Sequence, residues 1–175
     1  MSQENAEIVR PPQRLALVSD APGISELMRV SVRLPASRDT ARAMSQENVE
    51  RVREAMAAYN RSDFDAAVEL FDPEIEWVFP PAMDAESCHG PDEIKRLWRG
   101  VDETFEEFRV EPQEFLDGGE RVAVRARFRG RGKTSGAELD EEMFHHVFSF
   151  REGRIVRIEH ITDWAEALEA AGRSE

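Results

Sequence analysis

Two histidines near the end of the chain have the residue type and spacing for acid–base chemistry. His146 and His160 lie in two runs rich in β-branched and aromatic residues, joined by Arg151-Glu152-Gly153, a pattern typical of a β-hairpin. Imidazole titrates near neutral pH and needs little tuning to give or take a proton. If both side chains point to one face of the hairpin, they can reach one ligand together as a general acid–base pair.

The length of the connecting loop decides which residues share that face. With a three-residue loop, three cross-strand pairs lie on one face: Phe144 with His160, His146 with Ile158, and Phe148 with Val156. A slip of one residue would place His145 there instead of His146. An alternative interpretation is that each histidine is a buried, hydrogen-bonded wall residue with no chemical role.

A second group of reactive side chains lies in the loop 82–89, namely Asp84, Glu86, Cys88 and His89. Their spacing matches no recognised set of metal ligands, so we expect a solvated loop and no metal. Cys88 adjoins a histidine, but neighbouring loop residues rarely point together, and no helix N-terminus is expected to activate the thiol. Asp163 is expected to cap the final helix at Trp164.

Composition excludes several classes of partner. The formal net charge is -13 and the sequence pI is about 4.8, so the surface repels nucleic-acid backbones and anionic lipids. The single cysteine allows no intrachain disulfide, which suits a reducing compartment. No apolar run has the ~20 residues that a membrane span needs, and the N-terminus lacks the pattern of a secretory signal. We expect a cytoplasmic protein without cofactor, nucleic-acid partner or membrane partner.

The first ten residues recur further along the chain. MSQENAEIVR at 1–10 and MSQENVERVR at 44–53 are identical at eight of ten positions. A repeat this short cannot be a repeated domain, because it cannot bury a face. Either the start region is duplicated and Met44 is the working initiator, or 1–43 is an arm that packs on the domain or on a neighbouring copy. We expect an arm of low order over 1–43 and one domain over 44–175.

The spacing of apolar residues predicts the helices that position these side chains. A helix is expected over 45–59, with one apolar stripe of Val49, Val52, Met56 and Tyr59. A second helix follows a cap at Ser62 or Asp63 and ends at Asp72-Pro73. A third begins at Gly90-Pro91-Asp92, with Ile94, Leu97, Trp98, Val101 and Phe105 as its apolar residues.

Strands are expected over 75–79, 108–116, 122–129, 139–150 and 155–162. In the clearest of them, Val122, Val124, Ala126 and Phe128 alternate with Arg125, Arg127 and Arg129. Acidic residues Glu138, Asp140 and Glu142 lie on a neighbouring strand. These charges indicate either a solvated face or a surface that meets a second copy across a two-fold axis.

Residues 44–172 resemble the SnoaL-like group of the nuclear-transport-factor-2-like superfamily. The resemblance lies in NRSDFDA at 60–66, FDPEIEW at 71–77, HGPDEI at 89–94 and REGRI at 151–155, followed by Asp163. It implies an α+β fold: a cone-shaped half-barrel in which a strongly bent mixed or antiparallel sheet wraps around helices and encloses a pocket. It also implies a homodimer formed through the outer face of the sheet.

The resemblance does not carry over the catalytic residues known in this superfamily. The positions that match the ketosteroid isomerase set hold Phe79, Ala55 and His146, and Phe79 cannot serve as a base. The positions that match the limonene epoxide hydrolase set hold Ala126, Phe128 and His160. Because this fold hosts many unrelated functions, the activity must be argued from the pocket itself.

The resemblance turns the face of His146 and His160 inward, toward a pocket for a small hydrophobic molecule. We expect cofactor-free isomerase, cyclase or hydrolase chemistry with these two histidines as proton-transfer groups; the alternative is a non-catalytic ligand-binding or dimerisation module. The expected ligand-binding residues are Trp77, Phe79, His89, Trp98, Phe105, Phe128, Phe144, Phe148 and Ile158.

Overall fold

The computed structural model describes residues 38–172, so residues 1–37 of the expected arm, with the first copy of the repeat, lie outside the described residues. The helices are α2 (Arg38–Asn60), α3 (Phe64–Val68), the short 3-10 helix η1 (Pro81–Met83), α4 (Gly90–Thr104) and α5 (Trp164–Ala170). The strands are β1 (Phe71–Val78), β2 (Cys88–His89), β3 (Phe105–Asp117), β4 (Arg121–Gly132), β5 (Glu138–Glu141), β6 (His145–Arg151) and β7 (Arg154–Ile161).

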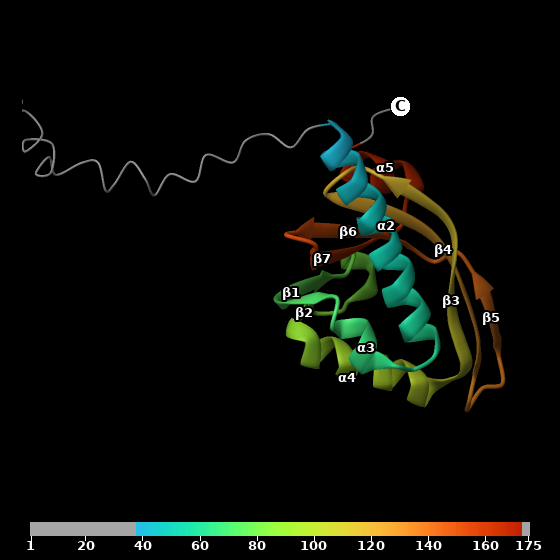
Figure 1. Ribbon diagram of the computed structural model, residues 1–175. Helices are drawn as coiled ribbons and strands as arrows, with labels where there is room; N and C mark the ends of the chain where they lie inside the picture. The colour runs from blue at the N-terminus through green and yellow to red at the C-terminus, as the bar shows by residue number, and fades with distance from the viewer. Residues whose placement is uncertain (1–37, 173–175) are drawn as a thin grey trace, which may run out of the picture. The chain divides into compact units, whose positions relative to one another are not determined.

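All the strands belong to one mixed sheet, in the order β2-β1-β7-β6-β4-β3, with β5 paired to β4. The β1–β7 pair is parallel and the other pairs are antiparallel. The sheet is strongly curled and does not close, and α2 and α4 lie within its curve (Figure 1). This arrangement confirms the expected α+β cone.

Helix α2 begins at Arg38, ahead of the expected start at Ser45, so 38–43 of the expected arm are helical. The second copy of the repeat therefore lies inside a helix. Ser45 and Asn48 are buried, and the amide of Asn48 donates to the carbonyl oxygen of Gly119 at 2.9 Å. Asn48 thus ties this helix to the β3–β4 turn.

The side chain of Asn60 ties the carboxyl end of α2 to β3, and Arg109 of β3 also donates to the Asn60 carbonyl oxygen at 3.2 Å. The Asn60 amide nitrogen donates to the Val110 carbonyl oxygen at 2.9 Å, and its amide oxygen accepts from the Val110 N–H at 2.9 Å. Asp63 then caps α3 by accepting from the Ala66 N–H at 3.2 Å, as expected. The expected end of that helix is wrong: α3 stops at Val68, and the segment Asp72-Pro73 lies in β1.

The two faces of β4 serve different clusters. Its inward residues pack with α2, α4 and β1 in the main core: Val122, Val124, Ala126 and Phe128. Its outward residue Ala123 packs under α5 with Val147, Leu116 and Ala167. We call this second cluster the outer cluster. Because α5 covers the convex side of the sheet, it takes no part in the core around α2.

The outward arginines of β4 are paired within the chain. Arg125 contacts Glu142 at 2.9 Å, Arg129 contacts Asp140 at 3.0 Å, and Arg127 also pairs with Asp140. The side chains are partly exposed, so these pairs contribute little to stability. Across 38–172 no helix is both long and apolar enough to cross a membrane.

Candidate functional site

The hairpin that carries the two histidines differs from expectation in its turn and in its register. The segment expected as one strand over 139–150 is two strands, β5 and β6. The turn is the two-residue Glu152-Gly153, with φ of 54° and 76°, the left-handed pair typical of a type I′ hairpin. His146 lies opposite His160, not opposite Ile158, which is the partner of Phe148.

Two deviations together keep the expected face of the hairpin inward. The shorter turn shifts the register by one residue, which alone would move every side chain to the other face. A β-bulge between Ser149 and Phe150 leaves Val156 as an extra residue of β7 and shifts the register by one more. The two shifts add up to a full side-chain period, so His146 and His160 still share the inner face.

His145 lies on the opposite face of β6. Its ring packs edge-on against Trp164 of α5, with ring centroids 5.1 Å apart, next to the outer cluster. The structure thus places His146, and not His145, toward the interior.

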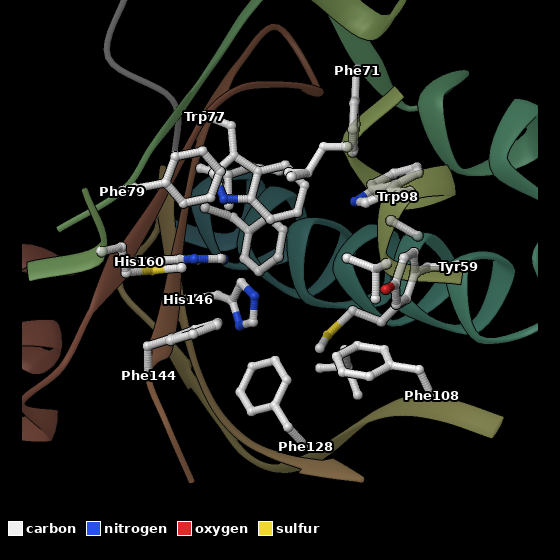
Figure 2. Close-up of a pocket in the computed structure, with 18 residues that line it drawn as sticks. Tyr59, Phe71, Trp77, Phe79, Trp98, Phe108, Phe128, Phe144, His146 and His160 are labelled. Carbon is white, nitrogen blue, oxygen red and sulfur yellow. The ribbon is translucent and has the colours of Figure 1, made fainter. Parts of the chain in front are cut away.

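A cavity of about 150 Å³ lies between α2, α4 and the inner face of the sheet (Figure 2). Met83 of η1, which is 41% exposed, lines it and marks the side where the cavity approaches the surface. No Lys, Arg, Asp or Glu is among the lining residues. These are Ala55, Met56, Tyr59, Phe71, Trp77, Phe79, Met83, Leu97, Trp98, Val101, Phe108, Val110, Phe128, Phe144, His146, Phe148, Ile158 and His160.

The two imidazoles meet in the wall of this cavity. Their ring centroids are 4.5 Å apart with the planes at 86°, so the edge of one ring faces the other. His160 is stacked on Phe144 at 4.1 Å and is contacted edge-on by Trp77 at 5.1 Å and Phe79 at 5.2 Å. Figure 2 shows His146 and His160 on the side of the cavity that faces away from Tyr59 and Trp98.

Several nitrogens in this wall are buried without a hydrogen-bond partner among residues 38–172: Nδ1 of His146, both ring nitrogens of His160, and Nε1 of Trp77. A buried polar atom left unpaired costs about 1–3 kcal/mol. Burial, followed by the charge of neighbouring His145, lowers the pKa of His146 to about 3. Burial, followed by the charge of His146, also lowers the pKa of His160 well below its ordinary value. Both imidazoles are therefore neutral at pH 7.

Two of the expected ligand-binding residues do not line the cavity. His89 is exposed at the start of α4, where its N–H donates to the Glu93 carboxylate at 2.8 Å. Phe105 falls outside because α4 ends at Thr104, which makes it the first residue of β3, packed against Phe108 at 5.3 Å. The other expected ligand-binding residues, together with both histidines, are brought together around the cavity.

Apart from Trp98 of α4, the sequence interpretation missed the helical contribution to the wall. Met56 and Tyr59 of α2, and Leu97 and Val101 of α4, were predicted only as apolar residues of their helices. The apolar spacing on both helices was visible in the sequence, but an apolar stripe does not reveal whether it faces another side chain or a cavity. Burial, and secondly the charge of Asp102, raise the pKa of Tyr59, so its hydroxyl stays protonated.

Cys88 and His89 form strand β2, in which Cys88 lies opposite Trp77 of β1. Within residues 38–172 no group of three His, Cys, Asp or Glu side chains is arranged to hold a metal ion. Cys88 is half-buried, and burial, followed by the charge of Glu93, raises the pKa of its thiol. The thiol is therefore protonated and a poor nucleophile.

Comparisons with known proteins agree with this architecture. A family model described as the SnoaL-like domain matches residues 52–158. A nuclear-transport-factor-2-like protein of unknown function from Burkholderia pseudomallei K96243 is 30% identical, with a TM-score of 0.61 over 73% of this chain and 98% of that chain. No curated protein matches the chain.

Two further solved structures are similar. A putative polyketide cyclase from Sinorhizobium meliloti is 25% identical, with a TM-score of 0.51 over 63% of this chain and 93% of that chain. TerC, co-crystallised with polyporic acid, is 24% identical, with a TM-score of 0.60 over 73% of this chain and 99% of that chain. The likeness to TerC shows a shared fold alone.

Proposed function

We propose that this chain, which belongs to the SnoaL-like domain family, binds a small, largely apolar molecule in the cavity between α2, α4 and the sheet. The observation that carries the proposal is a cavity of about 150 Å³ walled by aromatic rings, with few polar atoms in its wall. An engineered protein cavity of about 150 Å³, lined by aliphatic and aromatic residues, binds benzene. Ligand sites are commonly apolar with a small number of placed polar groups.

The tryptophans provide a direct binding assay. Trp77 and Trp98 line the cavity, whereas Trp164 lies on α5 at the outer cluster. Bromobenzene, a one-ring molecule with a heavy atom that quenches indole fluorescence, should quench the cavity tryptophans saturably. Replacing Trp164 with Phe removes the fluorescence of the tryptophan outside the cavity. The dependence of quenching on bromobenzene concentration should stay the same.

A matched pair of variants on α2 tests where the probe binds. Ala55 lines the cavity, and Ala57 is exposed on the same helix. Ala55→Leu should fill part of the void and weaken bromobenzene binding at least tenfold, whereas Ala57→Leu should not change it. Equal quenching of both variants and the wild type, or quenching that never saturates, would contradict binding in this cavity.

Acid–base catalysis at the same site is a second candidate, favoured by the direct opposition of His146 and His160 across β6 and β7. Two neutral imidazoles in contact could accept a proton from one substrate atom and return it at another, as a cofactor-free isomerase, cyclase or hydrolase requires. The low pKa of His146 reduces its strength as a base, and no carboxylate in the wall raises it. For that reason we place binding ahead of catalysis.

Deuterium exchange tests this second candidate without knowledge of the natural substrate. Acetophenone carries acidic C–H bonds beside a carbonyl and has a single ring. In D₂O the wild type should accelerate deuteration of its methyl group, and the double variant His146→Phe/His160→Phe should lose the acceleration. Trp164→Phe serves as the control. No acceleration by the wild type, or full activity of the double variant, would contradict catalysis by these histidines and leave ligand binding as the proposed function.

We also propose a homodimer, formed through the part of the outer sheet face that α5 leaves uncovered. The arginine row of β4 and its acidic partners lie there and are partly exposed. Light scattering during size-exclusion chromatography should give twice the chain mass, and Arg127→Glu, which repels Asp140, should shift it toward one chain mass. A single-chain mass for the wild type would contradict the dimer.

A further inference from the structure

We propose that the cavity selects uncharged one-ring molecules that carry a hydroxyl group, such as phenols and cyclic enols, over carboxylates and ammonium ions. The inference rests on the proposed binding function and deepens it by naming the chemical class of the ligand. It is carried by the lining of the cavity and by the unpaired nitrogens of His146, His160 and Trp77.

The lining disfavours anions. A carboxylate that enters the cavity gives up its hydration shell, and no Lys or Arg side chain among the lining residues replaces it. The two imidazoles do not supply a positive charge, because burial lowers the pKa of both. An anion therefore has no positively charged partner to offset its desolvation, and only neutral N–H groups to bind it.

The lining also disfavours cations, although aromatic rings can attract them through their faces. Here two pairs of rings each turn one face toward the other ring. His160 is stacked on Phe144 at 4.1 Å, and Trp77 is stacked on Phe79 at 6.1 Å. No Asp or Glu lines the cavity to offset the lost hydration of an ammonium group.

The polar atoms of the wall suit a group that both donates and accepts. A neutral imidazole offers one N–H donor and one nitrogen acceptor, and an indole offers one N–H donor. A hydroxyl group can donate to an imidazole nitrogen and accept from the other imidazole or from Trp77. An ether oxygen can only accept, and a hydrocarbon leaves every nitrogen unpaired. The volume of about 150 Å³ limits the ligand to about one ring.

A panel of one-ring probes near pH 7 tests the class on the wild-type protein. Phenol, anisole, toluene, benzoate and benzylammonium are titrated by the tryptophan-quenching competition with bromobenzene described above. Phenol should bind about tenfold more tightly than toluene, because a net hydrogen bond contributes about that factor. Anisole should fall between the two. Benzoate and benzylammonium should bind more weakly than toluene.

The outcomes separate this inference from the proposed function. If toluene binds as tightly as phenol, or if either ion binds most tightly, the ligand class is wrong and the cavity is still a binding site. If neither bromobenzene nor any probe binds, the proposed function fails, and the inference fails with it.

Variants then test the two imidazoles. His146→Phe and His160→Phe keep a ring at each position and remove its nitrogens, so each should lower the ratio of phenol to toluene affinity toward one while toluene still binds. Trp164→Phe, outside the cavity, should keep the wild-type ratio. Retention of the full ratio in both histidine variants would overturn the role of the imidazoles. Should either variant fail to fold, the other variant and the wild-type panel still decide the question.

Discussion

His146 and His160 lie directly opposite each other on β6 and β7, with ring centroids 4.5 Å apart, and both are buried. Neither imidazole has a carboxylate partner among residues 38–172, and the pKa of each is lowered chiefly by burial. A pair of this kind lowers stability in acid, because protonation would place two positive charges side by side in an apolar wall.

The first prediction concerns the dependence of stability on pH. In the unfolded chain a histidine binds a proton near pH 6.5, whereas His146 in the folded chain binds one only near pH 3. Between these values the unfolded state holds more protons, so the free energy of unfolding falls as the pH falls, by at most about 1.4 kcal/mol per pH unit for each such histidine.

Urea unfolding at several pH values between about 7 and 5 measures this slope while most carboxylates stay ionised. The double variant His146→Phe/His160→Phe should show a much shallower slope than the wild type. The same slope in both proteins would mean that the two imidazoles take up protons in the folded state.

The second prediction concerns the β6–β7 turn. Gly153 has a φ of 76°, and an added Cβ would meet only the end of the Arg51 side chain at 3.8 Å. Gly153→Ala should therefore lower the free energy of unfolding by about 1 kcal/mol through backbone strain alone. Gly100→Ala, at an open position within α4, should raise it by about 0.5–1 kcal/mol. Urea unfolding measures the free energy of unfolding of both variants. If both variants are less stable than the wild type, strain in the turn is not the cause.

The third prediction concerns the link between α2 and β3. Asn60→Ala removes both hydrogen bonds to Val110 and should lower the free energy of unfolding by about 2 kcal/mol. Asn60→Asp keeps an acceptor for the Val110 N–H but loses the donor, so it should cost less than the alanine variant. Thermal unfolding compares them. An alanine variant as stable as the wild type would show that these bonds are replaced by water at no cost.

The fourth prediction separates α5 from the cavity. Asp163 caps α5 by accepting from the Glu166 N–H at 3.0 Å. Asp163→Ala should lower the free energy of unfolding by about 1 kcal/mol. Asp163→Asn should lower it less, because asparagine can also cap a helix. Because α5 packs on the outer cluster, bromobenzene quenching of the cavity tryptophans should be unchanged in both variants. Weaker quenching in Asp163→Ala would show that the outer cluster supports the cavity wall.

The fold was predictable because its signals are local. The apolar stripe through Val52 and Met56, the Asp63 cap and the alternation along β4 each report a residue's own neighbourhood, and each is confirmed. The start of α2 at Arg38 was not predicted, because the contact that buries Asn48, a hydrogen bond to Gly119, joins residues far apart in the sequence.

The sequence predicted most of the aromatic residues and both histidines of the site, but not how the two histidines pair. A hairpin with a three-residue turn placed the two histidines on one face, and this face is right because the shorter turn and the bulge each shift the register by one residue. Their direct opposition was missed, because the bulge at Val156 has no signature in a run of β-branched residues. Phe105 was misplaced for a related reason: an apolar residue at a helix end fits the helix stripe and the following strand equally well.

The parallel pairing of β1 with β7 brings the first strand of the described chain against the last. Antiparallel β2, only two residues long, is the other neighbour of β1, so this strand lacks a lasting partner until the ribosome has delivered residue 161. Pairings that join distant parts of a chain form late and slowly. The cavity should therefore take shape only once β7 has been synthesised, and a nascent chain that stops before β7 should expose Trp77 and Phe71 to chaperones.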